Sequence, residues 1–185
     1  MQELWLDPLL RWLRVRKVFS QIPAGCRLLD IGCGRSAWLL RRVASRIEQG
    51  VGVDFKVKAM QVENLHLIPL QLTDQLPFAD ASFDLVTMLA VLEHIEHERH
   101  ILQEVRRVLK PNGRLVLTVP SIWSKPVLEF LAYRLKLIDE QEIRDHKRYY
   151  SRAQLQQVLI VETQFKGFQH HYFQLWMNNF CTVLK

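Results

Sequence analysis

Cysteine, glycine and proline are all scarce in this sequence, which has three, seven and seven of them. Cys26, Cys33 and Cys181 form no CxxC pair and are odd in number, so we expect neither a disulfide framework nor a zinc site. So little glycine and proline excludes a collagen-like or low-complexity chain. The cysteine usage fits a reducing compartment, and we expect a cytoplasmic protein.

Long hydrophobic runs are also missing. No apolar stretch approaches the roughly 18 residues that a membrane span needs, and the first residues, MQELWLDPLL, lack the basic start and long apolar centre of a signal peptide. We therefore expect no membrane span. The 185 residues, 49% of them hydrophobic, fit one globular domain over 1–185, with a helical leader over 1–22 and an insertion over 121–150.

Positive charge is in moderate excess, with 25 Lys and Arg against 19 Asp and Glu and a formal net charge of +6. This excess favours anionic partners without naming one. Binding to nucleic acid is possible but not indicated. The basic residues Arg11, Arg14, Arg16 and Lys17 fit a solvated helix face, or a surface that guides a phosphorylated ligand or RNA.

Apolar strand-like runs alternate with segments of helical spacing, which is typical of a doubly wound parallel α/β sheet. The predicted strands cover 27–31, 50–54, 66–70, 83–88 and 113–119. The predicted helices cover 4–19, 39–47, 56–62, 101–109, 128–135 and 151–159, the last beginning with an S-x-x-Q capping box. Two final strands, joined near Asn178 and Asn179, are expected to pair antiparallel at the sheet edge.

A glycine loop follows the first predicted strand. Gly32, Cys33 and Gly34 stand between that strand and a helix, where glycine lets the backbone approach a ligand and the helix start offers N–H groups. Asp54 closes the second strand, 54 − 32 = 22 residues after the first loop glycine. Its carboxylate is placed either to accept both hydroxyls of a ribose or to cap a turn. The pattern predicts a site for a nucleotide-like ligand.

Five stretches in one order connect the sequence to a family: LLDIGCG, VGVD, LPFADASFD, VLEHI and LQEVRRVLKPNGRLVLTVPS. Over 27–121 the chain resembles the class I S-adenosylmethionine-dependent methyltransferases. The resemblance implies a Rossmann-like, seven-stranded sheet, mostly parallel with an antiparallel last strand, and S-adenosylmethionine as cofactor. It also implies methyl transfer to oxygen, nitrogen or carbon of a small molecule, glycan or lipid precursor, with 121–150 on the acceptor side.

The resemblance also suggests residue roles. Asp30, Gly32, Cys33 and Gly34 would lie near the methionine moiety, Asp54 and Phe55 near the ribose, and Gln71, Leu72 and Leu89 along the rest of the cofactor. Two positions depart from the family pattern. Ser36 replaces a frequent third loop glycine and could cap the next helix, and Gln71 stands where an acidic residue is often found near the adenine.

Acceptor-binding residues are expected after the fourth and fifth predicted strands. Glu93 and His94 either line the acceptor pocket or pack against the sheet, and Tyr149 and Tyr150 belong to the HKRYYS segment, which resembles segments of small-molecule methyltransferases. His146 is the best candidate for a catalytic base, although a structural, hydrogen-bonded histidine is the stronger alternative. No metal is expected, because the spacing of His94, His97 and His100 rotates the third ring away from the first on a helix.

Other functions stay open at this point. Gly32 to Ala37 also satisfies the G-x-G-x-x-A pattern of NAD(P)-binding oxidoreductases, although Asp30 would repel a pyrophosphate and attract a methionine ammonium. A non-catalytic S-adenosylmethionine-binding subunit and an RNA methyltransferase are further alternatives. The sequence does not reveal the acceptor or the oligomeric state.

Overall fold

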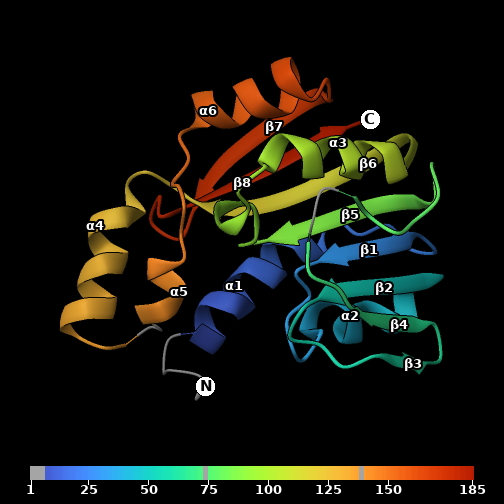
Figure 1. Cartoon of the computed structure of the whole chain (residues 1–185), viewed down its shortest axis with the longest axis horizontal. Coiled ribbons are helices and arrows are strands. Elements are labelled where there is room, and N and C mark those ends of the chain that lie inside the picture. The colour runs from blue at the N-terminus through green and yellow to red at the C-terminus, as the bar shows by residue number, and fades with distance from the viewer. Residues whose placement is uncertain (1–6, 73–74, 138–139) are drawn as a thin grey trace.

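One eight-stranded sheet organises the chain, with helices on both of its faces (Figure 1). The computed structural model describes residues 7–72, 75–137 and 140–185. The strands are β1 Arg27–Ile31, β2 Gln49–Asp54, β3 Met60–Val62, β4 Leu65–Pro69, β5 Phe83–Leu89, β6 Leu109–Pro120, β7 Lys166–Phe173 and β8 Asn178–Leu184. The α-helices are α1 Asp7–Phe19, α2 Trp38–Val43, α3 Glu98–Val108, α4 Ser124–Glu129, α5 Glu140–Arg144 and α6 Arg152–Gln156. Short 3₁₀ turns occupy η1 Ala44–Arg46 and η2 Leu92–His94, and π-helical turns extend α4 as η3 Phe130–Arg134 and α6 as η4 Gln157–Glu162.

The strand order is β3-β4-β2-β1-β5-β6-β8-β7. Strands β4, β2, β1, β5 and β6 run parallel, whereas β8 pairs antiparallel with β6 and β7. The central strands are short apolar runs such as RLLDI and FDLVTML, as expected for strands covered on both faces. The predicted α/β class, its mostly parallel sheet and its antiparallel last strand are confirmed.

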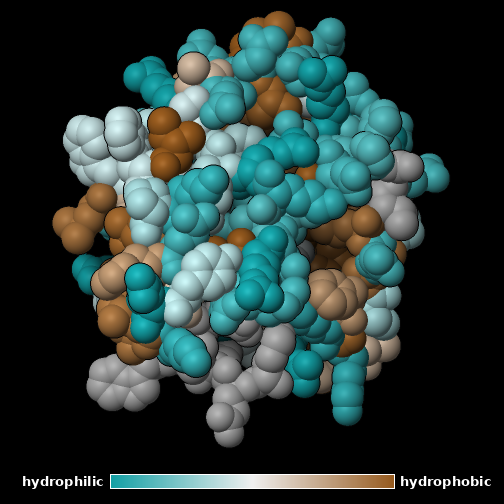
Figure 2. Space-filling model, turned by 60° about the vertical axis from the view of Figure 1, so that its left-hand side comes forward, coloured by the Kyte–Doolittle hydropathy of each residue, from teal (hydrophilic) through white to brown (hydrophobic). Residues whose placement is uncertain are grey.

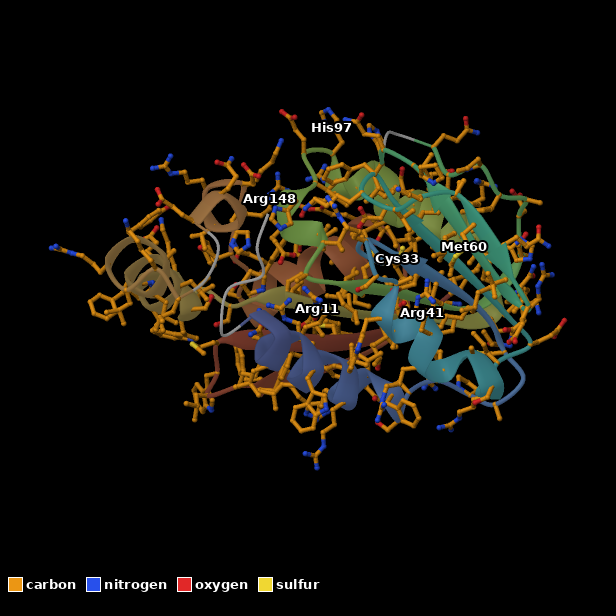
Figure 3. All side chains as sticks on the ribbon, turned by 90° about the horizontal axis from the view of Figure 1, so that it is seen from below. Arg11, Cys33, Arg41, Met60, His97 and Arg148 are labelled. Carbon is orange, nitrogen blue, oxygen red and sulfur yellow. The ribbon has the colours of Figure 1, made fainter. Side chains whose placement is uncertain are left out.

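Two apolar cores lie on opposite faces of the sheet. One packs α3, α6 and η4 against the sheet, through residues such as Leu102, Val105 and Leu159. The other packs α1 and α2, through residues such as Val18 and Leu40. The amphipathic pattern of the first helix is therefore explained, because its apolar side covers the sheet beside α2 (Figure 3).

The helix predicted over 56–62 is wrong, and this is the source of the eighth strand. The Asp54 carboxylate accepts the N–H of Lys56 (2.7 Å) and turns the chain directly after β2. Met60–Val62 then pairs antiparallel with β4. Seven residues are too few for a helix to offset a side-chain-stabilised turn and a ladder of backbone hydrogen bonds.

The turn predicted at Asn178 and Asn179 is also wrong, since both residues belong to β8 and are buried. The turn lies earlier, where Gln174, Leu175 and Trp176 all have a positive φ. The amide of Asn179 instead donates to the carbonyl of Tyr150 at 3.0 Å. Asparagine is common in turns, but here its amide satisfies buried carbonyl groups, a use that short-range sequence patterns do not reveal.

The two helix-start predictions have opposite outcomes. Ser151 and Gln154 form the expected reciprocal capping box of α6. Ser36, in contrast, does not cap α2: the N-cap is Ala37, with φ of 46° and no side-chain hydrogen bond. Among the described residues, no helix combines the length and apolar character needed to cross a bilayer.

The contact between β2 and the glycine loop gives a test of the packing. A Cβ atom on Gly52 would meet Leu40 Cδ1 at 2.7 Å, Leu67 Cδ2 at 2.8 Å and Cys33 Sγ at 2.9 Å. We expect Gly52→Ala to lower the free energy of unfolding by about 1–3 kcal/mol, because an extra methyl group overpacks this core. Urea unfolding measures this, and a loss below about 0.5 kcal/mol would contradict the packing described here.

Candidate functional site

The glycine loop joins β1 to α2 at the carboxyl end of the parallel strands. Gly32 and Gly34 have φ values of +74° and +69°, which residues with a Cβ atom rarely adopt. A Cβ on Gly32 would lie 2.2 Å from Val91 Cγ2, so the loop touches the segment that follows β5. A Cβ on Gly34 would meet nothing within 4 Å. The loop is therefore closed by protein at Gly32 and open at Gly34.

Asp54 fastens this loop to the end of β2. One carboxylate oxygen accepts the N–H of Gly34 at 2.9 Å, and the other accepts the N–H of Lys56 at 2.7 Å. Both readings of Asp54 made from the sequence are thus compatible, since it caps a turn at the rim of the glycine loop. Each carboxylate oxygen has a second lone pair that is available to a hydroxyl donor.

Asp30 is buried in β1, with 3% of its surface exposed, directly before the loop. One of its oxygens accepts the hydroxyl of Thr87 at 2.6 Å. Burial, opposed by this hydrogen bond and reinforced by the nearby charge of Asp54, raises the pKa of Asp30 to about 7. Sequence reasoning did not identify Thr87, because its link to Asp30 joins two neighbouring strands that lie 57 residues apart.

The other residues expected around a cofactor lie at or after the carboxyl ends of four neighbouring strands, β4, β2, β1 and β5. Phe55 follows β2 and is 68% exposed, and Leu89 closes β5. Gln71 is exposed and Leu72 half-buried in the segment after β4, which is tied to β2 by the Leu70 N–H and the Asp54 carbonyl (3.2 Å). Cys33 is buried, and burial raises the pKa of its thiol far above the usual value. Thiolate chemistry is therefore disfavoured at this position.

A second group of predicted residues meets on the far side of Val91. Glu93 is 1% exposed, and the rings of His94 and His146 lie 4.9 Å apart. Nδ1 of His94 lies 3.3 Å from the carbonyl oxygen of Asp145, and the N–H of Lys147 donates to the carbonyl of Glu93 at 2.9 Å. These bonds bring two segments together that are more than 50 residues apart in sequence.

Residues 145–150 form a strap along η2 and the start of α3. Lys147 is ion-paired with Glu96 (3.1 Å) and Arg148 with Glu98 (2.7 Å). Tyr150 is buried, and its hydroxyl bonds to Glu98. Tyr149 is half-buried beside the His146 ring, and burial raises its pKa to about 12. Of the two predicted tyrosines, Tyr149 lies at the cavity and Tyr150 holds the strap in place.

His146 is neutral in this environment. Burial, followed by the neighbouring His94 ring and the Arg14 guanidinium, lowers the pKa of His146 to about 4. Its Nδ1 and the Nε of Arg14 are both buried atoms with no hydrogen-bond partner among the described residues. The sequence suggested a solvated face or ligand guidance for Arg14, but no pattern placed it near His146.

A metal ion is one possible occupant of this cluster. Glu93, His94 and His146 each offer a ligand atom, and these atoms lie within 4.8 Å of one another. Arg14, however, is close enough for its charge to act on His146, and a fixed cation repels a dication at this range. The absence of a metal site therefore stays a prediction.

A cavity of about 530 Å³ opens beside the strap. One wall comes from α4 and η3, including Lys125 and Tyr133, and the other from 143–149, including His146 and Tyr149. The volume suits a small organic molecule. The cluster of Glu93, His94 and His146 therefore adjoins two places where a ligand could lie. Through Val91 it adjoins the glycine loop, and through His146 it adjoins the cavity.

Comparison with known proteins finds a family match for the central region. Residues 29–117 match the family described as a methyltransferase domain. A demethylmenaquinone methyltransferase of Bacillus cereus (strain B4264) is 31% identical over 155 residues, which cover 75% of this chain and 65% of that protein. One of Bacillus anthracis (strain CDC 684) is 31% identical over 117 residues, covering 57% and 49%. The chain thus spans less than two thirds of these relatives.

Solved structures share the fold. An S-adenosylmethionine-dependent methyltransferase from Mesorhizobium loti has a TM-score of 0.71 at 17% identity, covering 98% of this chain and 100% of that one. A methyltransferase in complex with the Haloferax volcanii Trm112 activator also has a TM-score of 0.71, at 16% identity, covering 94% of this chain and 88% of that one. Identities this low establish the architecture alone.

The raised pKa of Asp30 links folding stability to pH. Because the folded-state pKa of about 7 lies above the ordinary aspartate value of 3.8, the folded state binds the proton more tightly than the unfolded state. Asp30 therefore loses stabilising influence as pH rises from about 4 to 7. We expect Asp30→Asn, which keeps the acceptor for Thr87, to be more stable than the wild type at pH 8, with a smaller difference at pH 5. Thermal unfolding across this range tests it, and a difference between the two proteins that is independent of pH would refute it.

Proposed function

We propose that the chain is a class I S-adenosylmethionine-dependent methyltransferase that transfers the activated methyl group of that cofactor to a small acceptor of the quinone type. The support for the acceptor class is the similarity to proteins named demethylmenaquinone methyltransferases. A cavity that would admit a small ring, next to a neutral histidine, fits such an acceptor.

The residues at the glycine loop fit the cofactor. The open space at Gly34 leaves room for a ligand against the backbone, and the free lone pairs of Asp54 suit the two hydroxyls of a ribose. The exposed ring of Phe55 offers an apolar surface beside Asp54, as a nucleoside needs. Asp30 would attract a methionine ammonium, whose charge in turn would favour the ionised carboxylate.

The observation that carries this proposal is that Val91 lies between the glycine loop and the cluster of Glu93, His94 and His146. Val91 contacts Gly32 of the glycine loop, and two residues later Glu93 and His94 meet His146 of the strap. A ligand held at Gly34 and a ligand in the cavity would therefore face the same segment. Alignment of a nucleophile with a bound methyl group can supply about 7–11 kcal/mol of the barrier, so positioning is the main task of these residues.

His146 suits binding better than proton abstraction. A base is most effective when its pKa lies near the working pH, and the pKa of His146 lies near 4. Its buried Nδ1 has no bond among the described residues and can take part in a hydrogen bond with a polar atom of the acceptor. We therefore assign His146 a role in orienting the acceptor, which revises the catalytic-base prediction.

The first test removes the Asp54 carboxylate. We expect Asp54→Ala to weaken S-adenosylmethionine binding by about 1–3 kcal/mol, because hydrogen bonds to a charged acceptor are lost and the loop is released. Titration calorimetry measures this. Asp84→Ala is the matched control, since Asp84 pairs with Lys110 and the N–H of Arg27 at the opposite edge of the sheet. Equal affinities in wild type and Asp54→Ala would remove Asp54 from the cofactor site.

The second test concerns the acceptor. We expect His146→Ala to lower kcat/KM for methyl transfer by about tenfold or more, because an orienting hydrogen bond is lost, while cofactor affinity stays unchanged. Partial recovery in His146→Asn would support hydrogen bonding over proton transfer. His97→Ala, at an exposed histidine outside the cluster, serves as control.

The assay supplies labelled methyl donor with demethylated quinols and with a lipid extract. Full activity in His146→Ala would exclude His146 from the acceptor site. Tight cofactor binding without label transfer to any acceptor would support the alternative of a non-catalytic binding subunit.

A further inference from the structure

The helical segment α4–η3 is apolar on two sides. Its inner side, through Leu128, Leu131 and Ala132, packs against Ile143 of α5. Its outer side exposes further large apolar residues to solvent. A helix that is apolar around most of its circumference normally has a partner on each side, and among the described residues the outer side has no apolar cluster like the one around Ile143.

The exposed outer side continues onto the turn between β7 and β8. In that turn Leu175 is 92% exposed and Trp176 is 65% exposed. The hydroxyl of Ser121 donates to the carbonyl of Trp176 at 2.6 Å, and the N–H of Ser121 donates to the carbonyl of Met177 at 2.9 Å. Since Ser121 precedes α4 by three residues, the turn lies beside the start of the helix. We call this surface the apolar face; it comprises Trp123, Val127, Phe130, Tyr133, Leu175 and Trp176.

Figure 2 shows apolar and aromatic side chains gathered on the side of the molecule that carries α4. Basic residues lie among them. Lys125, Arg134 and Lys136 are exposed, and no ion pair with a described residue is found for any of them. Glu129 is the single acidic residue between 122 and 137. The surface thus combines tryptophan, tyrosine and phenylalanine with uncompensated positive charge.

We propose that the apolar face docks on an anionic lipid bilayer. Aromatic and aliphatic side chains that insert at the headgroup boundary, flanked by lysine and arginine, are the pattern of helices that lie in a membrane surface. Protein interfaces, in contrast, are depleted of lysine. The charge of the segment complements anionic headgroups, and six large apolar side chains of two adjoining elements are exposed together rather than singly.

The apolar face adjoins the cavity, which suggests what docking on a bilayer would achieve. Tyr133 belongs to both the apolar face and the cavity wall, and Lys125 lines the same wall. The opposite wall carries His146 and Tyr149. A lipid-borne ring would therefore pass from the bilayer past α4 to His146 without crossing water. This last step rests on the proposed function, whereas docking itself does not.

Sedimentation with vesicles tests the docking without cofactor, acceptor or turnover. We expect the full chain to sediment with vesicles of equal parts phosphatidylglycerol and phosphatidylcholine, and to bind phosphatidylcholine vesicles at least tenfold more weakly. Added salt should weaken binding to the mixed vesicles. Equal binding to both vesicle types, or no binding to either, would overturn the proposal.

Two sets of variants localise the contact. We expect Trp123→Ser with Trp176→Ser, and separately Lys125→Gln with Arg134→Gln and Lys136→Gln, each to weaken binding to the mixed vesicles by tenfold or more. Val161→Ser with Val62→Ser is the matched control, because these valines are exposed elsewhere. Circular dichroism confirms that each variant is folded. Unchanged vesicle binding by both folded test variants would overturn the proposal.

Sedimentation equilibrium tests whether a second copy of the chain, rather than a bilayer, covers the apolar face. A dimer that dissociates in Trp123→Ser with Trp176→Ser would assign the face to a second copy of the chain and overturn the proposal. Vesicle binding that persists while methyl transfer fails on every acceptor would leave docking in place and refute the proposed function alone.

Discussion

The pairing of β1 with parallel neighbours on both sides is the constraint on which the site depends. Strand β1 hydrogen-bonds to β2 and to β5, so the carboxyl ends of all three strands reach one edge of the sheet. The pairing continues past the strand, since the N–H groups of Gly32 and Cys33 both donate to the carbonyl of Val53. The loop after β1 therefore has no freedom to leave the Asp54 turn or the Val91 segment. The glycine loop, the Asp54 turn and the Val91 segment therefore meet at that end of the sheet.

Burying the Asp30 carboxylate at this end of the sheet costs free energy. The packing of the fold does not require a carboxylate there. Asp30 is almost fully buried, and one hydroxyl, that of Thr87, compensates for the water it has lost. An apolar residue would fit a central strand better. An acid that is poised near neutrality, next to an open loop, is instead suited to respond to a positive charge arriving from a ligand.

Features that depend on neighbours in sequence could be predicted, and features that depend on distant partners could not. The strands around β1, the glycine loop and the capping box at Ser151 are local patterns of apolar runs, small residues and hydroxyls. The segment 56–62 was misassigned because the Asp54 side chain and β4, rather than local propensity, decide its structure. Asn179 was misassigned because its partners, the carbonyls of Tyr150 and of the end of β6, come from other elements. Among the candidate site residues, Gly32, Gly34 and Asp54 follow from spacing, whereas no sequence pattern placed Thr87 or Arg14 at the site.

The two walls of the cavity differ in how strongly they are held to the rest of the fold. The strap at 145–150 is held to η2 and α3 by backbone bonds and ion pairs, so His146 keeps a fixed place relative to the glycine loop. Among the described residues, no ion pair ties the outer side of α4–η3, while its inner side packs in the small cluster around Ile143 and Arg144 lies over the Tyr133 ring. The strap wall is thus held by more polar contacts than the α4 wall. For the proposed methyl transfer, a wall held by several polar contacts would favour precise alignment, and a wall held by fewer contacts would leave room for a lipid-borne acceptor to enter. The apolar face lies on the wall with fewer contacts.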